Sequence, residues 1–433
     1  MKHHKVILRF VLSMLFMLIL NTSSAEINTE SNYMDELFSE EEYPPDMDTL
    51  EEFIQSYYLL LDSNEYLNKF KYINQDKNLL HNDSSPLKGF YEKLMQLRSG
   101  LRDRVSIYQI GDSHMQSGYF PGTARSSLQK YFGNAGRGLV FPLRTAGTNQ
   151  PDDYRISSSG GLSRNNSARG ICGYALNTNS SPSLEITTNN FFNTDNSFNK
   201  ISVISSKPGL SASVKQSPSS TIDLYWRDYR SCSVTWDKPL TNVNLSLSGE
   251  PSTLYGLMLE RTQPGLLYHS AGINGAGFYT LLDSPHLFDQ IGILNPDLII
   301  ISLGTNDAQG RYRNDQFSSN LNKFMQLLRK GNPDTPVLFT LPPDSNKQGK
   351  HNSDLGKLEK TLVDYAKNNN CAWWTLSEVM GGKGSVGKWR TEQMASKDLL
   401  HYTPKGYMLQ GYLFYQAIIK SYKKYSENND PKD

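Results

Sequence analysis

The sequence of 433 residues contains only three cysteines, Cys172, Cys232 and Cys371. They form no Cys-x-x-Cys pair and no cysteine and histidine cluster with metal-ligand spacing, so we predict no zinc site. Cys172 and Cys232 lie in one β-rich region, and the sequence leaves open whether they pair. Cys371 precedes an apolar run that is typical of a buried strand, which predicts a thiol in the core.

The sequence also lacks an excess of charge of either sign, with 44 Lys and Arg residues against 43 Asp and Glu residues. This balance provides no basic groove for a polyanion, so we predict no nucleic-acid partner. The glycine-rich segment Phe132–Gly138 lacks the Gly-Lys-Ser/Thr sequence of a phosphate loop. With no metal cluster either, we expect the protein to need no cofactor and no metal.

Only one long apolar run is present, at residues 6–20. It follows Lys2 and Lys5 and precedes small residues at positions 23–25, which is typical of a secretory signal, residues 1–25, cleaved after Ala25. The run is shorter than the ~20 residues that a membrane span needs. We therefore predict a secreted or periplasmic protein with no stable membrane span after signal removal, and an uncleaved anchor is the alternative.

The rest of the chain changes character several times. Residues 26–85 begin with an acidic run, which predicts an acidic, partly disordered leader with a helical segment. Residues 152–255 contain short alternating apolar runs between polar turns, which predicts a β-sandwich or jelly-roll module. Residues 86–151 and 256–425 alternate strand and helix patterns, so we predict one discontinuous α/β domain, followed by a polar tail at 426–433.

A candidate nucleophile lies in "SIYQIGDSHMQSGYF", residues 106–120, where an apolar run stops at Gly-Asp-Ser-His. A strand that leads into a tight turn and then a helix places Ser113 at the carboxyl edge of a sheet. There the free N–H groups and the positive dipole end of the helix favour developing negative charge. This position suits a nucleophile, and ordinary turn or helix-cap chemistry is the alternative.

Three further stretches carry the groups that a serine nucleophile needs: "HSAGINGAG" (269–277), "SLGTNDAQ" (302–309) and "KDLLHYTPKGY" (397–407). A serine hydroxyl requires an adjacent base, most often a histidine held by a third group. Asp398 and His401 are three residues apart, which on one helical turn places both side chains on the same side. Gly275 and Asn306 can supply N–H groups to an oxyanion. Helix capping and turn formation are the alternatives for these residues.

In this order, "GDSH", "GINGAG", "GTND" and "DLLH" resemble the four sequence blocks of the SGNH hydrolases, also called GDSL esterases. The resemblance implies an α/β fold, with a three-layer α/β/α parallel sheet and an inserted β-sandwich or jelly-roll module. It also implies a catalytic triad and an oxyanion hole. The triad would be Ser113, His401 and Asp398, and the oxyanion hole Ser113, Gly275 and Asn306.

His114 replaces the leucine of the usual motif, and the distance in sequence from Ser113 to Asn306 is long. Both features are similar to the periplasmic peptidoglycan O-acetylesterases. The resemblance therefore implies an exported serine esterase that removes O-acetyl groups from a polysaccharide, with peptidoglycan preferred. His114, Arg137 and Arg144 are candidates for substrate contact.

Two alternative functions stay open: an esterase on other acetylated glycans or short-chain lipids, and a glycan-binding surface protein with a vestigial esterase site. The β module interrupts the chain between the nucleophile and the glycine block. We therefore expect its ends to lie at the carboxyl edge of the sheet and the module to favour polymeric substrates. The sequence leaves the oligomeric state open. The aromatic residues that could stack on sugar rings are Tyr225, Trp226 and Trp236.

Overall fold

The computed structural model describes residues 47–61, 64–179, 181–215 and 221–429. The predicted signal at 1–25, residues 26–46 and 62–63 of the predicted acidic leader and the last four residues of the polar tail lie outside these residues. The chain divides into two compact units, residues 1–53 and 54–433, and the boundary falls within helix α3 (Met47–Leu61). The description below concerns the second unit.

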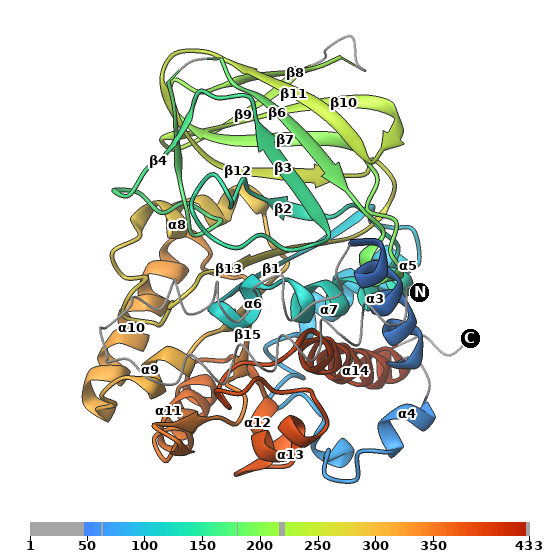
Figure 1. The fold of residues 1–433 in the computed structure, drawn as a ribbon, viewed down its shortest axis with the longest axis vertical. Coiled ribbons are helices and arrows are strands. Elements are labelled where there is room, and N and C mark those ends of the chain that lie inside the picture. Colours follow the sequence, from blue (N-terminus) through green and yellow to red (C-terminus); the bar gives the residue numbers. More distant parts are fainter. Residues whose placement is uncertain (1–46, 62–63, 180, 216–220, 430–433) are drawn as a thin grey trace, which may run out of the picture. The chain divides into compact units, whose positions relative to one another are not determined.

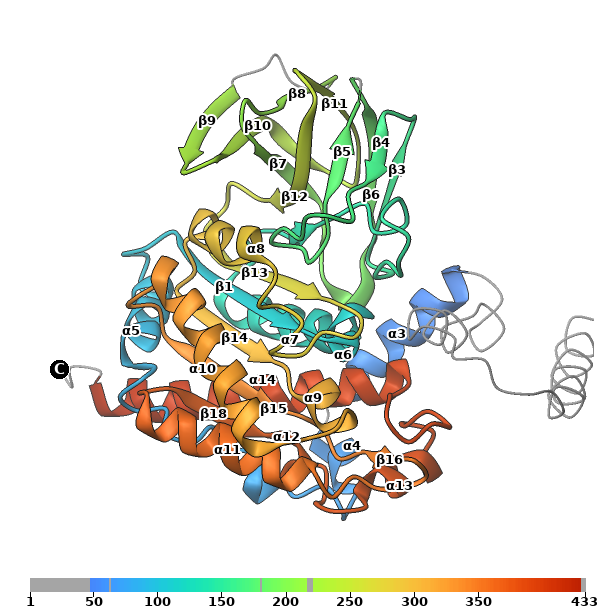
Figure 2. The ribbon, with the colours of Figure 1, turned by 90° about the vertical axis from the view of Figure 1, so that its left-hand side faces the viewer.

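A five-stranded parallel sheet, in the order β13-β1-β14-β15-β18, forms the centre of the α/β part (Figure 2). Continuous apolar runs such as "LIIIS" are buried along their whole length, as expected for a parallel sheet that is covered on both faces. The parallel sheet confirms the predicted α/β class. The strands are β1 (Arg104–Gly111), β13 (Gly265–Gly272), β14 (Leu298–Ser302), β15 (Val337–Leu341) and β18 (Ala372–Thr375).

Helices cover both faces of this sheet, which gives the expected three layers (Figures 1 and 2). One layer contains α5 (Lys88–Arg98), α7 (Tyr119–Phe132) and α14 (Pro404–Asn429), and the other α8 (Pro285–Gln290), α10 (Asn314–Gly331) and α11 (Leu355–Asn368). In α10 the buried residues recur every three or four positions and form one apolar stripe. Shorter helical segments are α4 (Asn64–Asn68), η1 (Gln75–Lys77), α6 (Ser113–Gln116), η3 (Ile291–Leu294), α9 (Thr305–Gln309), α12 (Leu376–Val379) and α13 (Ser385–Thr391).

Two antiparallel sheets form the β region, at the top of Figure 1. One has the order β4-β5-β12-β7-β10-β9, with β2 beside β12, and the other has the order β3-β6-β11-β8. Burial alternates along strands such as β11, which is typical of two sheets that pack face to face. These sheets agree with the predicted inserted β module.

The elements of the β region are β2 (Gly138–Val140), β3 (Tyr154–Ser158), β4 (Leu162–Arg164), β5 (Leu176–Thr178), β6 (Ser183–Thr188), η2 (Phe191–Asn193), β7 (Phe198–Ser206), β8 (Ser211–Val214), β9 (Thr221–Trp226), β10 (Tyr229–Leu240), β11 (Asn242–Ser248) and β12 (Ser252–Glu260). A separate hairpin near the carboxyl edge of the parallel sheet consists of β16 (Asn346–Lys347) and β17 (Lys350–His351).

Counted from β2 to β12, the β region leaves and rejoins the α/β part at the amino edge of the parallel sheet. The expected start of the module, Asp152, instead lies beside Tyr119 at the beginning of α7, near the carboxyl edge. Arg261 N donates to Ala135 O at 2.8 Å, which places the two ends of the insertion side by side. Gly265, the first residue of β13, pairs with Arg104, the first residue of β1. The reason is that α7 has already brought the chain back to the amino edge before β2 begins, and β2 pairs with β12.

The cysteines and the candidate stacking residues are mostly buried. Cys172, Cys232 and Cys371 are free thiols, and Cys371 is a core residue as predicted. Trp236 is 6% exposed, and Trp226 is half-buried and donates its ring N–H to Asp289 O at 3.2 Å. Of the three aromatic residues, Tyr225 alone is largely exposed, at 57%. No helix within the described ranges is long and apolar enough to cross a membrane.

Candidate active site

Ser113 is the first residue of α6, directly after the end of β1. Asp112 caps this short helix, because its Oδ1 accepts the N–H of His114 at 3.0 Å. The adjacent strands β13 and β14 both run parallel to β1, so the loops that follow them lie at the same edge of the sheet. The strand, turn and helix therefore place the serine as the sequence predicts.

The structure brings Ser113, His401 and Asp398 together in one hydrogen-bonded chain. Ser113 Oγ lies 3.1 Å from His401 Nε2, and His401 Nδ1 lies 2.6 Å from Asp398 Oδ2. Ser113 and His401 are only 5% and 8% exposed. With Nδ1 of the imidazole bound to the carboxylate, the Nε2 atom faces the serine hydroxyl and can accept its proton.

The Asp398 carboxylate is held by several donors. Its Oδ1 accepts the backbone N–H groups of Leu400 and His401, each at 3.0 Å. Burial alone would raise the pKa of Asp398, but the hydrogen bond and charge of His401 and the two backbone N–H groups together hold this pKa below its ordinary value. The carboxylate therefore stays ionised and can orient the imidazole.

Asp398 and His401 lie in a turn before α14 rather than on the helical turn that their spacing suggested. Leu399 has a φ of +55°, and its carbonyl accepts the N–H of Asn346 at 2.8 Å. The helix starts only at Pro404, whose missing N–H and fixed φ suit the first position of a helix. The two backbone N–H groups bound by Asp398 form the turn that brings the carboxylate to the imidazole.

Gly275 and Asn306 also lie close together at this edge. Gly275 follows β13 and has a φ of +69°, a left-handed conformation that glycine adopts without a Cβ clash. Asn306 lies in α9, after β14, and its Nδ2 donates to Ala276 O at 2.9 Å. An amide nitrogen carries two hydrogens, so Asn306 keeps a second N–H beyond this contact. The Asn306 side chain, one candidate oxyanion donor, therefore binds the residue that follows Gly275, the other candidate donor.

His114 lies against His401. It is 3% exposed, its Nδ1 lies 3.0 Å from the Tyr407 hydroxyl, and its ring centroid is 5.4 Å from that of His401. Burial lowers the pKa of His114 to about 3, so the ring is neutral near pH 7. Its observed side-chain contacts include Tyr407 of α14 and His401.

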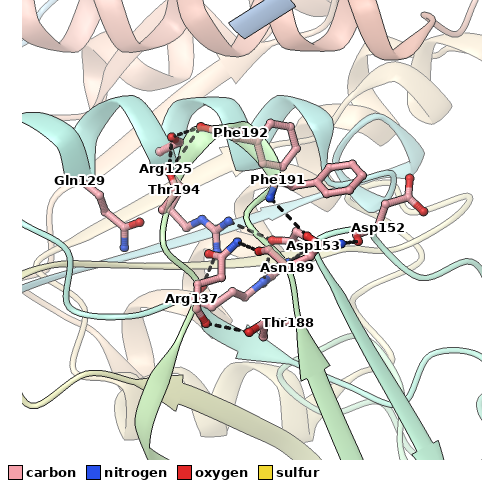
Figure 3. A network of polar contacts seen from close by, with 12 residues as sticks. Arg125, Gln129, Arg137, Asp152, Asp153, Thr188, Asn189, Phe191, Phe192 and Thr194 are labelled. Carbon is pink, nitrogen blue, oxygen red and sulfur yellow. Dashed lines mark hydrogen bonds and ion pairs between the residues drawn. The ribbon is translucent and has the colours of Figure 1, made fainter. Parts of the chain in front are cut away.

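The two candidate arginines have different surroundings. Arg137 is buried, and its guanidinium donates to both oxygens of Asp153, at 3.0 and 2.9 Å, and to Leu139 O at 2.6 Å. Arg125 of α7 binds the same carboxylate at 2.9 Å, so Asp153 lies between two guanidinium groups (Figure 3). The observed partners of Arg137 are therefore groups of the protein itself. Arg144 is exposed.

Two buried carboxyl groups border the site. Burial raises the pKa of Asp112 to about 7 and that of Asp307 to about 6. Asp307 Oδ2 accepts the N–H of Phe278 at 3.1 Å, in the loop that contains Gly275. Neither group is part of the hydrogen-bonded chain from Ser113 to Asp398. In the described part of the chain, no group of three or more His, Cys, Asp or Glu side chains could hold a metal ion.

The sequence patterns missed a glutamine at the centre of a polar cluster. Gln116, three residues after Ser113, bonds to Asn274 and to Thr148, Asn149 and Tyr174. Only two sequence features pointed to this contact: Gln116 lies in the same stretch as Ser113, and Asn274 lies beside Gly275. The other partners lie far away in sequence, and only the fold brings them together.

Comparison with known proteins gives a family match over part of the chain. Residues 240–409 match the model of the GDSL-like Lipase/Acylhydrolase family. The matched region contains Gly275, Asn306, Asp398 and His401, whereas Ser113 precedes it on the other side of the inserted strands. No curated protein sequence matches the chain.

The fold is similar to that of the solved structure "Peptidoglycan O-acetylesterase in action, 5 min", with a TM-score of 0.65 and 20% sequence identity. That likeness covers 79% of this chain and 98% of the other, so it includes strands of the β region. A lipase/acylhydrolase from Enterococcus faecalis has a TM-score of 0.30 at 20% identity and covers 36% of this chain and 77% of its own. The acetyl xylan esterase AlAXEase has a TM-score of 0.30 at 20% identity, over 35% and 81%.

The family match covers three of the four sequence blocks, and the long structural match covers the α/β fold together with its inserted β strands. Both agree with the resemblance that the four blocks suggested. The protein is therefore a carboxylic ester hydrolase that resembles the SGNH hydrolases of the GDSL-like acylhydrolase type, and its fold is similar to that of a peptidoglycan O-acetylesterase.

Proposed function

We propose that this ester hydrolase is an exported serine esterase that removes O-acetyl groups from a polysaccharide, with peptidoglycan as the preferred substrate. The hydrogen-bonded chain from Ser113 through His401 to Asp398 carries the proposal. The fold shared with a peptidoglycan O-acetylesterase supports the substrate class, and the signal pattern at residues 1–25 supports export.

The reaction has two halves. Ser113 Oγ attacks the acetyl carbonyl carbon while His401 Nε2 takes the hydroxyl proton, and the tetrahedral intermediate collapses as His401 returns this proton to the leaving sugar oxygen. Water then attacks the acetyl-serine, with His401 again as the base. Acetate leaves, and the proton held by His401 returns to Ser113. Asp398 fixes the imidazole orientation and stabilises its charged form throughout.

The negative charge of each tetrahedral intermediate needs fixed donors. In this proposal they are the backbone N–H groups of Ser113 and Gly275 and the second side-chain N–H of Asn306. Removing a single such donor typically slows catalysis by roughly 10²- to 10³-fold. Because these groups come from the loops after β1, β13 and β14, the parallel sheet fixes their relative positions.

The test is acetate release from O-acetylated peptidoglycan, acetylated xylan and a short-chain synthetic ester. Ser113→Ala and His401→Ala should each lose nearly all turnover, because nucleophile and base act as one unit, and Asp398→Asn should retain more. Ser117→Ala, a change of the same type one turn later on the chain, is the matched control and should remain active. A folded Ser113→Ala protein with substantial turnover would refute the mechanism. Faster release from xylan than from peptidoglycan would reject the preferred substrate and retain the esterase.

A further inference from the structure

The Gln116 side chain uses its full hydrogen-bonding capacity. Its Nε2 donates to Thr148 Oγ1 at 2.6 Å and to Asn149 O at 3.1 Å. Its Oε1 accepts the Tyr174 hydroxyl at 3.1 Å and the backbone N–H of Asn274 at 2.8 Å. A primary amide offers two donors and two acceptor sites, so every one of them is occupied. Gln116 itself is only 3% exposed.

These contacts fix the peptide groups around Gly275 from two sides. Gln116 of α6 holds the N–H of Asn274, the residue before Gly275, and Asn306 of α9 holds the carbonyl of Ala276, the residue after it. Each contact crosses from a different helix at the carboxyl edge of the sheet. The direction of the Gly275 N–H therefore depends on both side chains.

The backbone also places Gln116 directly against the end of β13. A Cβ atom on Gly272 would lie 2.1 Å from Gln116 N, so this close approach requires glycine. The short helix α6 therefore contacts both parts of the site. It contains Ser113, three residues before Gln116, and it packs against Gly272, after which the loop with Gly275 begins. A shift of Gln116 would move the serine and the Gly275 N–H relative to each other.

We propose that Gln116 is a positioning residue for the oxyanion hole, which it also links to the loops of the β region. The inference rests on the proposed function. Thr148 and Asn149 lie between β2 and β3, inside the β region, and Tyr174 lies just before β5. Through Gln116, these loops help to set the position of a donor for the reaction, in addition to any contact that they make with a polymer.

The test compares Gln116→Met with the native protein on a short-chain acetyl ester. Methionine has a similar length but neither donates nor accepts these hydrogen bonds. We expect kcat to fall roughly 10- to 100-fold, less than the loss of a direct donor, with KM changed less than about threefold. A boronic acid that forms a tetrahedral adduct on Ser113 should bind more weakly by a similar factor, because its oxygen occupies the oxyanion position.

Gln129→Met is the matched control. Gln129 is also buried, and its amide donates to Gly136 O and Leu266 O, near the amino edge of the sheet. We expect it to lower the melting temperature while kcat and boronate affinity stay within about twofold of the native values. If Gln116→Met does not fold, Thr148→Val removes the 2.6 Å contact to Nε2 and should lower kcat and boronate affinity together.

The outcomes separate this inference from the proposed function. A native protein that is inactive on acetyl esters would reject the proposed function itself. An active native protein with a folded Gln116→Met variant whose kcat and boronate affinity are unchanged would overturn the positioning role alone. A rise in KM at unchanged kcat would do the same, because it would make Gln116 a substrate contact.

Discussion

Asp112 is a buried carboxyl group that both caps α6 and holds a proton near neutral pH. Its Oδ1 accepts the His114 N–H at 3.0 Å, and burial raises its pKa to about 7, well above the ordinary value of an aspartate. Between about pH 4 and pH 7 the folded protein therefore binds a proton at Asp112 that the unfolded chain has already lost. The free energy of unfolding should decrease as pH rises through this window.

The substitution Asp112→Asn removes this titration and keeps the cap, because asparagine is as good an N-cap residue as aspartate. The native protein should lose stability more steeply between pH 4.5 and 6.5 than the variant, by up to about 1.4 kcal/mol per pH unit. Urea unfolding at several pH values measures both slopes. Equal slopes would show that Asp112 is ionised in the folded protein throughout this range.

Residues differ in how far the sequence reveals them. Ser113, Asp398 and His401 lie in short blocks with a chemical pattern, and the structure brings the three side chains into contact as expected. Gln116 has no such pattern, since three separate segments of the chain supply its hydrogen-bond partners. Arg137 stands in a glycine-rich segment that suggested a substrate contact, and its partner Asp153 is recognisable only once the β region is folded.

At the scale of elements, a buried ion pair joins helix α7 to strand β3. Arg125 of α7 and Arg137 both bind Asp153, which directly precedes β3, and all three side chains are at most 5% exposed (Figure 3). Burial alone would raise the pKa of Asp153, but the two guanidinium groups hold it below the ordinary value. The carboxylate is therefore ionised and neutralises part of the buried positive charge.

Asp153→Asn should destabilise the protein by about 3–5 kcal/mol, because it leaves two buried guanidinium groups without an anionic partner. The neighbouring substitution Asp152→Asn is the matched control. Asp152 accepts one hydrogen bond, from the Tyr119 hydroxyl at 2.6 Å, and we expect a loss of about 1 kcal/mol there. Chemical unfolding of both variants at pH 7 gives the comparison. Equal losses would contradict the central role of the Asp153 carboxylate.

Elements were predictable where the pattern is periodic. The parallel strands, α10, α11 and α14 and the alternating strands of the β region correspond to their sequence patterns. The segment with Asp398 and His401 was expected to form a helical turn, because a spacing of three fits a helix. Hydrogen bonds from the Asp398 carboxylate to two backbone N–H groups favour a turn instead, and this competition cannot be read from spacing.

At the scale of the whole molecule, the β region is bound into the α/β part. The sequence alone suggests that a short linker in place of residues 152–255 would spare hydrolysis of a small ester. The structure indicates instead that this replacement would also slow hydrolysis of the small ester. Asp153 and Tyr174 lie in the replaced stretch, where they contact Arg125 and Gln116.

A cleaner deletion removes residues 136–260 and joins Ala135 to Arg261, whose backbone atoms already form a 2.8 Å hydrogen bond. We expect the shortened protein to be less stable and to hydrolyse even a small acetyl ester more slowly, since Gln116 loses three of its four partners. A cooperative melt establishes folding before kcat is measured. A folded deletion variant with the native kcat on the small ester would limit the β region to polymer binding.

The close contact between Ala135 and Arg261 also has a consequence for the evolution of the chain. A single exchange of genetic material at these two points would add or remove the β region without breaking the α/β chain. Such an exchange would leave Arg125 without its carboxylate partner and Gln116 with only one of its four partners, which costs stability in any lineage that keeps these side chains. We therefore expect the inserted region and these two side chains on α6 and α7 to be inherited as one unit.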